Sequence, residues 1–198
     1  MKRFLSANAP LYDAFLREAI AEEAELLDAL CEGLQPTAAD PELRQRILGG
    51  LTNDGRLACY VKPVAELLDV QLATAAQLLD RALDPQQFST PLPGIGFLWV
   101  DGGPRTAEAL RGFVRVAAGQ SFPSHEHLGR ESLLVLQGTL FDDSRQVQLG
   151  PGDLDVLPAG STHAFRVPAD SPDLLGLAVN EVGLRMLGKT VRSRPKIT

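Results

Sequence analysis

Residues 119–138 read GQSFPSHEHLGRESLLVLQG and hold His125, His127 and Glu131 at fixed offsets between two glycines. Side chains two residues apart on a β-strand point to the same face, so His125 and His127 should face the interior together. Gly129 allows a tight turn, after which Glu131 can open the next strand on the same inner face. The stretch therefore predicts two antiparallel strands that carry three metal-ligating side chains to one site.

A second stretch, residues 152–163, reads GDLDVLPAGSTH and supplies the remaining histidine of the chain. The Pro-Ala-Gly turn at 158–160 precedes His163, which we expect to reach the same site from a later strand. Three neutral imidazoles and one carboxylate suit a divalent first-row metal, and zinc is favoured with iron, manganese and nickel as alternatives. The expected ligands of a single ion are His125, His127, Glu131 and His163.

The composition is that of a globular protein with room for a core. Of the 198 residues, 44% are hydrophobic, and no apolar run approaches the ~18 residues of a membrane span. Ser6, Asn8 and Asp13 interrupt any signal-peptide core after the basic start. Cys31 and Cys59 are too far apart for a CxxC motif and too few for a disulfide framework. We therefore expect a cytoplasmic protein without a membrane segment.

The excess negative charge lies in the N-terminal half. Residues 1–90 contain eight Lys or Arg against fourteen Asp or Glu, a net charge of −6, whereas residues 91–198 contain eleven of each. Apolar residues in the first half recur at intervals of three, four or seven, with Pro and Gly near the expected helix ends. An acidic all-α domain is therefore expected over residues 1–85, with its last two helices near 61–70 and 73–83.

Short apolar runs separated by turn residues follow this helical half. Residues 86–93, rich in Pro, Gln and Ser or Thr, are expected to form a linker. Runs such as GFLWV, GFVRVAA and LLGLAVN are typical of an antiparallel barrel. We expect an all-β metal-binding barrel over residues 94–188 and a flexible basic tail over residues 189–198.

The two histidine-bearing stretches match the signature motifs of the cupin family, whose fold is an antiparallel jelly-roll barrel. An acidic helical domain followed by a cupin resembles the ChrR-like cupin anti-sigma factors, and FPSHEHLGRE, LVLQG, the DDS turn and PAGSTHAF resemble that branch in detail. Val167 stands where the general cupin motif has Asn. The resemblance implies that an extracytoplasmic-function sigma factor binds the helical domain, that the cupin domain responds to stress, and that the metal ligands are His125, His127, Glu131 and His163.

The N-terminal half departs from the zinc-binding members of that family. Those members use a His-x3-Cys-x2-Cys arrangement and an earlier histidine. Here Cys31 could occupy the first cysteine position, but Leu27 and Leu34 take the other places and no histidine precedes His125. We therefore expect the helical domain to fold without zinc and to bind a sigma factor, if it does so, through its acidic surface. A homodimer through the cupin domain remains open.

Two other functional classes are compatible with the sequence. A three-His, one-Glu site also serves metal-dependent cupin enzymes of the dioxygenase or isomerase type. The barrel segment has neither Tyr nor Cys to assist a metal, however, and Arg115 is expected on the outer face. Residues 61–82 also have the apolar spacing of a helix-turn-helix. Because this segment supplies few cations to neutralise phosphates, direct binding to nucleic acid is not expected and helix packing explains the spacing better.

Overall fold

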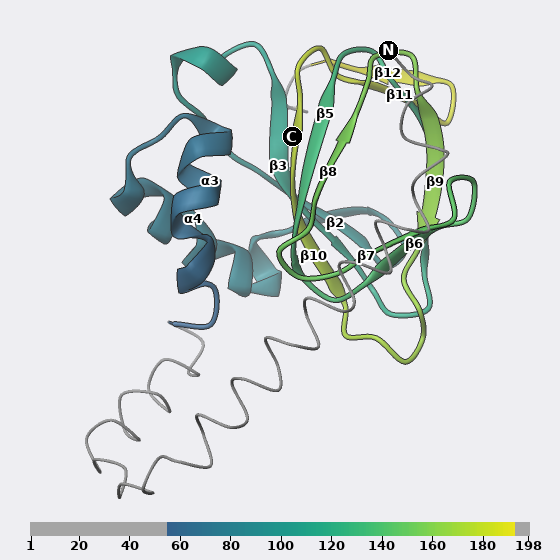
Figure 1. Cartoon of the computed structure of the whole chain (residues 1–198), viewed down its shortest axis with the longest axis horizontal. Helices are drawn as coiled ribbons and strands as arrows, with labels where there is room; N and C mark the ends of the chain where they lie inside the picture. The colour runs from purple at the N-terminus through teal and green to yellow at the C-terminus, as the bar shows by residue number, and fades with distance from the viewer. Residues whose placement is uncertain (1–54, 193–198) are drawn as a thin grey trace, which may run out of the picture. The chain divides into compact units, whose positions relative to one another are not determined.

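The computed structural model describes residues 55–192, and Figure 1 shows short helices beside a body of β-strands. Expectations for residues 1–54 and 193–198, including Cys31 and most of the acidic helical half, lie outside the described residues. The helices and the strands belong to the same compact unit of the chain. No described helix has the length and apolarity that crossing a membrane would require.

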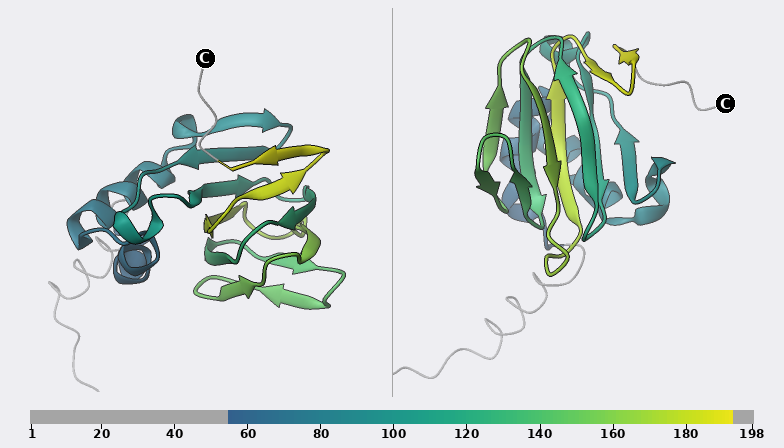
Figure 2. Two further views of the ribbon diagram at one scale, coloured as in Figure 1. Left: turned by 90° about the horizontal axis from the view of Figure 1, so that it is seen from above. Right: turned by 90° about the vertical axis from the view of Figure 1, so that its right-hand side faces the viewer.

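The strands form two antiparallel six-stranded sheets that face each other (Figure 2). Sheet A has the order β1 (Ser89–Leu92), β2 (Ile95–Trp99), β3 (Leu110–Val116), β10 (Leu174–Asn180), β5 (Glu131–Gln137) and β8 (Leu154–Leu157). Sheet B has the order β12 (Lys189–Val191), β11 (Leu184–Met186), β4 (Ser121–His127), β9 (Thr162–Arg166), β6 (Leu140–Asp142) and β7 (Val147–Leu149). Six of the ten neighbouring strand pairs join strands that are not consecutive in sequence, and this arrangement of two facing sheets confirms the predicted jelly-roll.

Strand β5 shows why sheet A lies at the centre of the unit. Leu133 and Val135 point into the space between the sheets, where they pack with Phe122, Phe165 and other apolar residues. Leu134 and Leu136 point the other way, into a second apolar cluster that includes the helices. The run ESLLVLQ is nearly all apolar because both of its faces are buried, whereas a one-sided strand would alternate with polar residues.

The helices α3 (Val61–Leu68) and α4 (Leu72–Leu83) cover the outer face of sheet A (Figure 1). Their apolar stripes, which include Val64, Leu68 and Leu79, pack with sheet residues such as Phe113 and Leu177. The apolar spacing of residues 61–82 is thus explained by packing against the sheet. Three short 3₁₀ turns complete the described elements, at Ala58–Tyr60, Pro85–Gln87 and Pro104–Thr106.

The structure differs from the sequence-based boundaries at two places. Residues 86–93, expected as a linker, contain β1, which pairs with β2 through Ser89 opposite Phe97 and Leu92 opposite Ile95. Lys189–Val191, expected to begin a flexible tail, forms β12 against β11. Both are short edge strands, whose exposed polar side chains resemble a loop in sequence. The helices α3 and α4 likewise join the barrel, since their apolar faces are buried on it.

The packing of α3 on sheet A can be tested by removing one buried leucine. Leu68 is fully buried, so Leu68→Ala should lower the free energy of unfolding by about 2–5 kcal/mol through lost transfer energy and a residual cavity. Leu72 is 57% exposed in the next helix, and Leu72→Ala should change it by less than about 0.5 kcal/mol. Urea denaturation followed by circular dichroism measures both. Equal effects would show that α3 does not pack as described.

Candidate metal centre

Strand β4 brings two histidines to the interior through an interruption of its pairing. The register between β4 and β9 shifts between Phe122 and His125, around Pro123, which has no N–H to donate to a neighbouring strand. Phe122 and His125 are three residues apart, yet both are buried, and His127 is buried with them. Without this irregularity, period-two alternation would turn both histidines away from the face that Phe122 occupies.

His163 reaches the same site from β9. It stands directly opposite His125 in the β4–β9 pairing and is 4% exposed. The turn before it contains Gly160 with φ of 79°, a conformation that residues with a side chain rarely adopt. The N–H of Gly160 donates to the carbonyl of His127 across 2.7 Å. This turn ties the second histidine-bearing stretch to the first and confirms that His163 comes from a later strand.

Glu131 enters from the opposite sheet. It is the first residue of β5, as the sequence predicted, and is 6% exposed. Gly129 allows the chain to cross between the sheets, because a Cβ at this position would lie 2.8 Å from the Val182 side chain and 2.9 Å from its backbone nitrogen. Close approach to another segment therefore explains this glycine.

Asn180 is a buried polar residue of the site that sequence reasoning missed. It stands opposite Glu131 in the β5–β10 pairing, is 2% exposed, and donates from Nδ2 to Glu131 Oε1 across 2.6 Å. Its Oδ1 lies 3.5 Å from His127 Nδ1. An Asn at the end of the apolar run LLGLAVN gives no local signal of this role, since only strand pairing places it beside Glu131.

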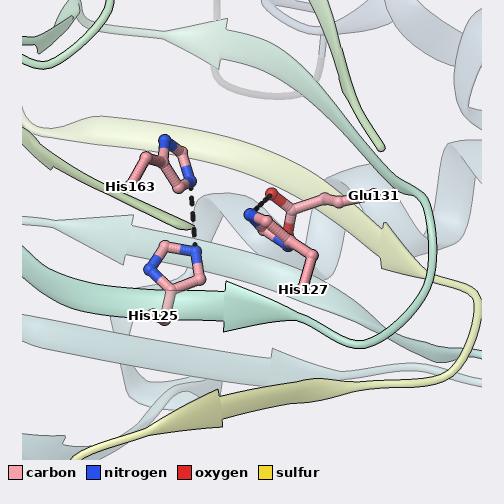
Figure 3. A group of neighbouring side chains, drawn as sticks. All are labelled: His125, His127, Glu131 and His163. Atoms are coloured by element: carbon pink, nitrogen blue, oxygen red, sulfur yellow. Dashed lines mark hydrogen bonds and ion pairs between the residues drawn. The ribbon is translucent and has the colours of Figure 1, made fainter. Parts of the chain in front are cut away.

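The four predicted side chains converge between the sheets (Figure 3). One candidate ligand atom from each residue lies within 4.8 Å of the others, and all four residues are buried: His125, His127, Glu131 and His163. The structure therefore brings together every residue of the predicted site. Two strands of sheet B and one strand of sheet A contribute to it.

The hydrogen bonds of two histidines fix the direction of their lone pairs. His125 Nδ1 lies 3.0 Å from the carbonyl oxygen of Pro123, and His163 Nδ1 lies 2.8 Å from Asp142 Oδ2. Both oxygens are acceptors, so each Nδ1 carries the proton and each Nε2 presents a lone pair. These two Nε2 atoms face each other at 3.2 Å. Facing lone pairs repel, and a cation between them would convert the repulsion into coordination.

His127 adds a third nitrogen directed to the same point. Asn180 donates from Nδ2 to Glu131, so its Oδ1 faces His127 Nδ1 as an acceptor. His127 Nε2 is then left buried without a hydrogen-bond partner among the described residues, 3.5 Å from Glu131 Oε2. Such an unpaired buried nitrogen costs free energy unless a ligand satisfies it. Three imidazole lone pairs and one carboxylate therefore fit a divalent cation.

Burial sets the protonation of these groups. It lowers the pKa of His125 to about 4, against the opposing effect of the Pro123 carbonyl, and it also lowers the pKa of His127. Both imidazoles are consequently neutral at pH 7, which is the form that binds metals. Burial raises the pKa of Glu131 to about 7, although the hydrogen bond from Asn180 opposes this. Within the described residues, the Glu131 carboxylate forms no ion pair with a lysine or arginine.

A small cavity lies beside the candidate ligands. Its volume is about 40 Å³, and its walls are mainly aromatic and aliphatic: Phe97, Trp99, Leu110, Gly112, Val114, Phe122, Leu133, Phe165, Ala178 and Leu184, with His125, Glu131 and Asn180 as polar members. A space of this size holds a few small molecules such as water. Pockets for typical organic ligands are several times larger, about 300 Å³ or more.

Groups that could assist chemistry at a metal lie elsewhere. Arg115 donates to the Ala82 carbonyl across 3.3 Å and lies over the Phe88 ring, so it faces the helices as expected and not the cavity. Cys59 is exposed in the 3₁₀ turn before α3, and Tyr60 follows it. The cavity therefore has no cationic, thiol or phenol group among its lining residues.

The part of the chain that contains the candidate ligands matches a known protein family. The family model described as the ChrR cupin-like domain matches residues 84–174. This segment is a ChrR cupin-like domain. It includes all four candidate ligands, and it confirms the family resemblance drawn from the sequence. No curated protein matched the chain.

Several solved structures resemble the ChrR cupin-like domain. A cupin-like protein of unknown function from Ralstonia eutropha is 17% identical with a TM-score of 0.43, covering 49% of this chain and 65% of that one, which is less than two thirds of its length. An acetylacetone dioxygenase from Acinetobacter johnsonii is 17% identical with a TM-score of 0.45, covering 55% and 78%. The anti-sigma ChrR of Rhodobacter sphaeroides, in complex with SigE, is 23% identical with a TM-score of 0.48, covering 88% and 84%.

Two glutamates five residues apart provide a matched test of metal binding. The wild type should purify with about one equivalent of divalent metal per chain, and Glu131→Gln or His163→Ala should lose most of it, because losing a ligand lowers affinity. Glu126 lies between the two β4 histidines but pairs with Arg185 on the outer side, so Glu126→Gln should retain the metal. Elemental analysis measures the content. Full retention in the first two variants would refute the ligand set.

Proposed function

We propose that this protein is a metal-binding cupin regulator of the ChrR type. Its cupin domain holds one divalent ion, with zinc favoured, on His125, His127, Glu131 and His163, and its N-terminal half binds an extracytoplasmic-function sigma factor. The observation that carries the proposal is the convergence of three unprotonated histidine nitrogens and a buried carboxylate in a ChrR cupin-like domain. When bound, the ion would cross-link the two sheets and offer an open coordination position to small molecules.

The size of the cavity favours a regulator over an enzyme for organic substrates. A cavity of about 40 Å³ beside the candidate ligands suits a small neutral oxidant, whereas pockets for organic substrates are usually several times larger. Apart from His125, Glu131 and Asn180 the walls are apolar, and no lysine or arginine lines the cavity to bind a substrate carboxylate or phosphate. A site of this kind is suited to sensing a small reactive molecule at the metal or its ligands.

The sheet arrangement supplies a physical connection between the metal site and the helices. Glu131 extends inward from β5 to the candidate ion, while Leu134 and Leu136 of the same strand extend outward into the apolar cluster that contains α3 and α4. A change at Glu131, such as loss of the ion, would shift strand β5, whose two faces are both buried against other parts of the protein. The helices resting on that strand then repack, which is the local change a switch requires.

The sigma factor partner is supported by the domain match and by charge. The Rhodobacter sphaeroides ChrR is described as an anti-sigma factor in complex with SigE, and residues 1–90 here carry a net charge of −6. An acidic surface would attract the basic DNA-binding face of a sigma factor and would lose part of that attraction at high salt. This role requires a cytoplasmic protein. It does not require the chain to bind nucleic acid or a membrane.

Co-purification with the sigma factor encoded nearest to this chain tests the proposal. We expect the wild type to retain the sigma factor in the resting state and to release it after treatment with peroxide or a chelator. Glu131→Gln should show an altered response, because its metal site is impaired, whereas Glu126→Gln should behave as wild type. Raising the salt concentration should weaken the complex. The partner fraction is measured on gels after affinity capture.

The same samples distinguish the regulator from a metal-dependent cupin enzyme of the dioxygenase or isomerase type. Absence of any sigma factor complex, together with steady turnover of a small molecule that His127→Ala abolishes, would reject the regulator and establish the enzyme. If the sigma factor binds but neither peroxide nor chelator releases it, the protein is an anti-sigma factor whose metal site takes no part in the response.

A further inference from the structure

Asp142, the last residue of β6, is a fully buried carboxylate with five hydrogen bonds. Its Oδ1 accepts from the Ser144 N–H at 3.0 Å, the Ser144 hydroxyl at 2.6 Å and the Arg145 N–H at 3.1 Å. Its Oδ2 accepts from Arg145 Nε at 2.6 Å and from His163 Nδ1 at 2.8 Å. Three of these partners, the backbone N–H groups of Ser144 and Arg145 and the Arg145 Nε–H, can only donate, so the site favours an ionised carboxylate.

The N–H groups that surround Asp142 favour its ionised form, because a protonated carboxyl oxygen would face a donor with a donor. A fixed negative charge beside His163 Nδ1 keeps the proton on that nitrogen and leaves Nε2 free.

Arg145 connects this carboxylate to the opposite sheet. Its Nη1 and Nη2 donate to Asp155 Oδ1 and Oδ2 at 3.0 and 2.6 Å, which is a bidentate pair. Asp142 and Arg145 belong to the β6–β7 hairpin of sheet B, whereas Asp155 lies on β8 at the edge of sheet A. The side chains of Arg145 and Asp155 are only 29% and 12% exposed, so solvent screens this contact weakly.

We propose that Asp142 is the positioning residue of the metal centre, and that Arg145, anchored by Asp155 across the two sheets, holds Asp142 in place. Asp142 fixes both the tautomer and the ring orientation of His163. This inference rests on the proposed metal binding for its consequence, but the tautomer of His163 exists without any metal. The two claims can therefore fail separately.

Asp142→Asn exposes the role because it changes charge and donor pattern at nearly constant volume. The amide oxygen should turn toward the Ser144 and Arg145 backbone N–H groups, which cannot move away. The amide NH₂ would then replace Oδ2 and donate to His163 Nδ1. That arrangement forces the His163 proton onto Nε2, the nitrogen that a metal needs.

Zinc affinity, measured by competition with a chromogenic chelator, is the first readout. Asp142→Asn should lower the affinity about 10–100-fold, the usual cost of losing a hydrogen-bond partner behind a metal ligand. The matched control is Asp143→Asn, because the neighbouring carboxylate is 63% exposed and pairs only with the half-exposed Arg166. That control should bind zinc like wild type. Equal affinity in the two variants would overturn the proposal.

The second readout is the nitrogen NMR spectrum of the metal-free protein. Wild type and Asp143→Asn should show His163 protonated at Nδ1, and Asp142→Asn should show a substantial fraction protonated at Nε2. Unchanged tautomers in a folded Asp142→Asn protein would refute positioning by Asp142. If wild type binds no zinc but the tautomer changes as stated, the metal site fails while the positioning role stands.

Asp155→Asn tests the anchor across the sheets. This substitution weakens the bidentate pair with Arg145 and leaves the direct contacts of Asp142 and His163 in place. Zinc affinity should therefore fall by a smaller factor than in Asp142→Asn. The loss in the double variant should be less than the product of the two single losses, because both act through one chain of contacts. Wild-type affinity in Asp155→Asn would remove Arg145 and Asp155 from the proposal.

Discussion

The candidate metal centre depends on one constraint: the Nε2 lone pairs of two histidines on the paired strands β4 and β9 point at each other. His125 and His163 stand opposite each other in the strand register, and the partners of their Nδ1 atoms oblige both Nε2 atoms to point at the same small volume. Neutral imidazoles arranged in this way repel. A cation between them would turn this repulsion into coordination, and His127 and Glu131 offer two further ligand atoms near the same point.

Each of the four side chains is held by a partner behind it. The Pro123 carbonyl orients His125, Asp142 orients His163, and Asn180 lies between His127 and Glu131. These partners are themselves buried or part of the backbone. These contacts hold the four side chains in place, so little further ordering would be needed to bind a cation.

Local sequence patterns predicted which four side chains come together, but not their hydrogen-bond partners. Spacing of two on a strand, a turn at Gly160 and the family motifs were sufficient to predict this grouping, since these signals are short-range. Asn180 and the links of Asp142 to Arg145 and Asp155 arise from pairing between strands far apart in the sequence, which no local pattern encodes. The edge strands β1 and β12 were missed for a related reason, because exposed strands of three or four residues have the composition of loops.

The burial of both faces of β5 has a consequence for how the protein can be divided. The segment that matches the cupin-like family begins at residue 84, after both helices, yet the outer side of sheet A presents Phe113, Leu134, Leu175 and Leu177 to the helices. A fragment restricted to the barrel would leave this apolar area in contact with water. Areas of that kind drive self-association, so the solubility of the cupin domain depends on two helices that its family motifs do not include.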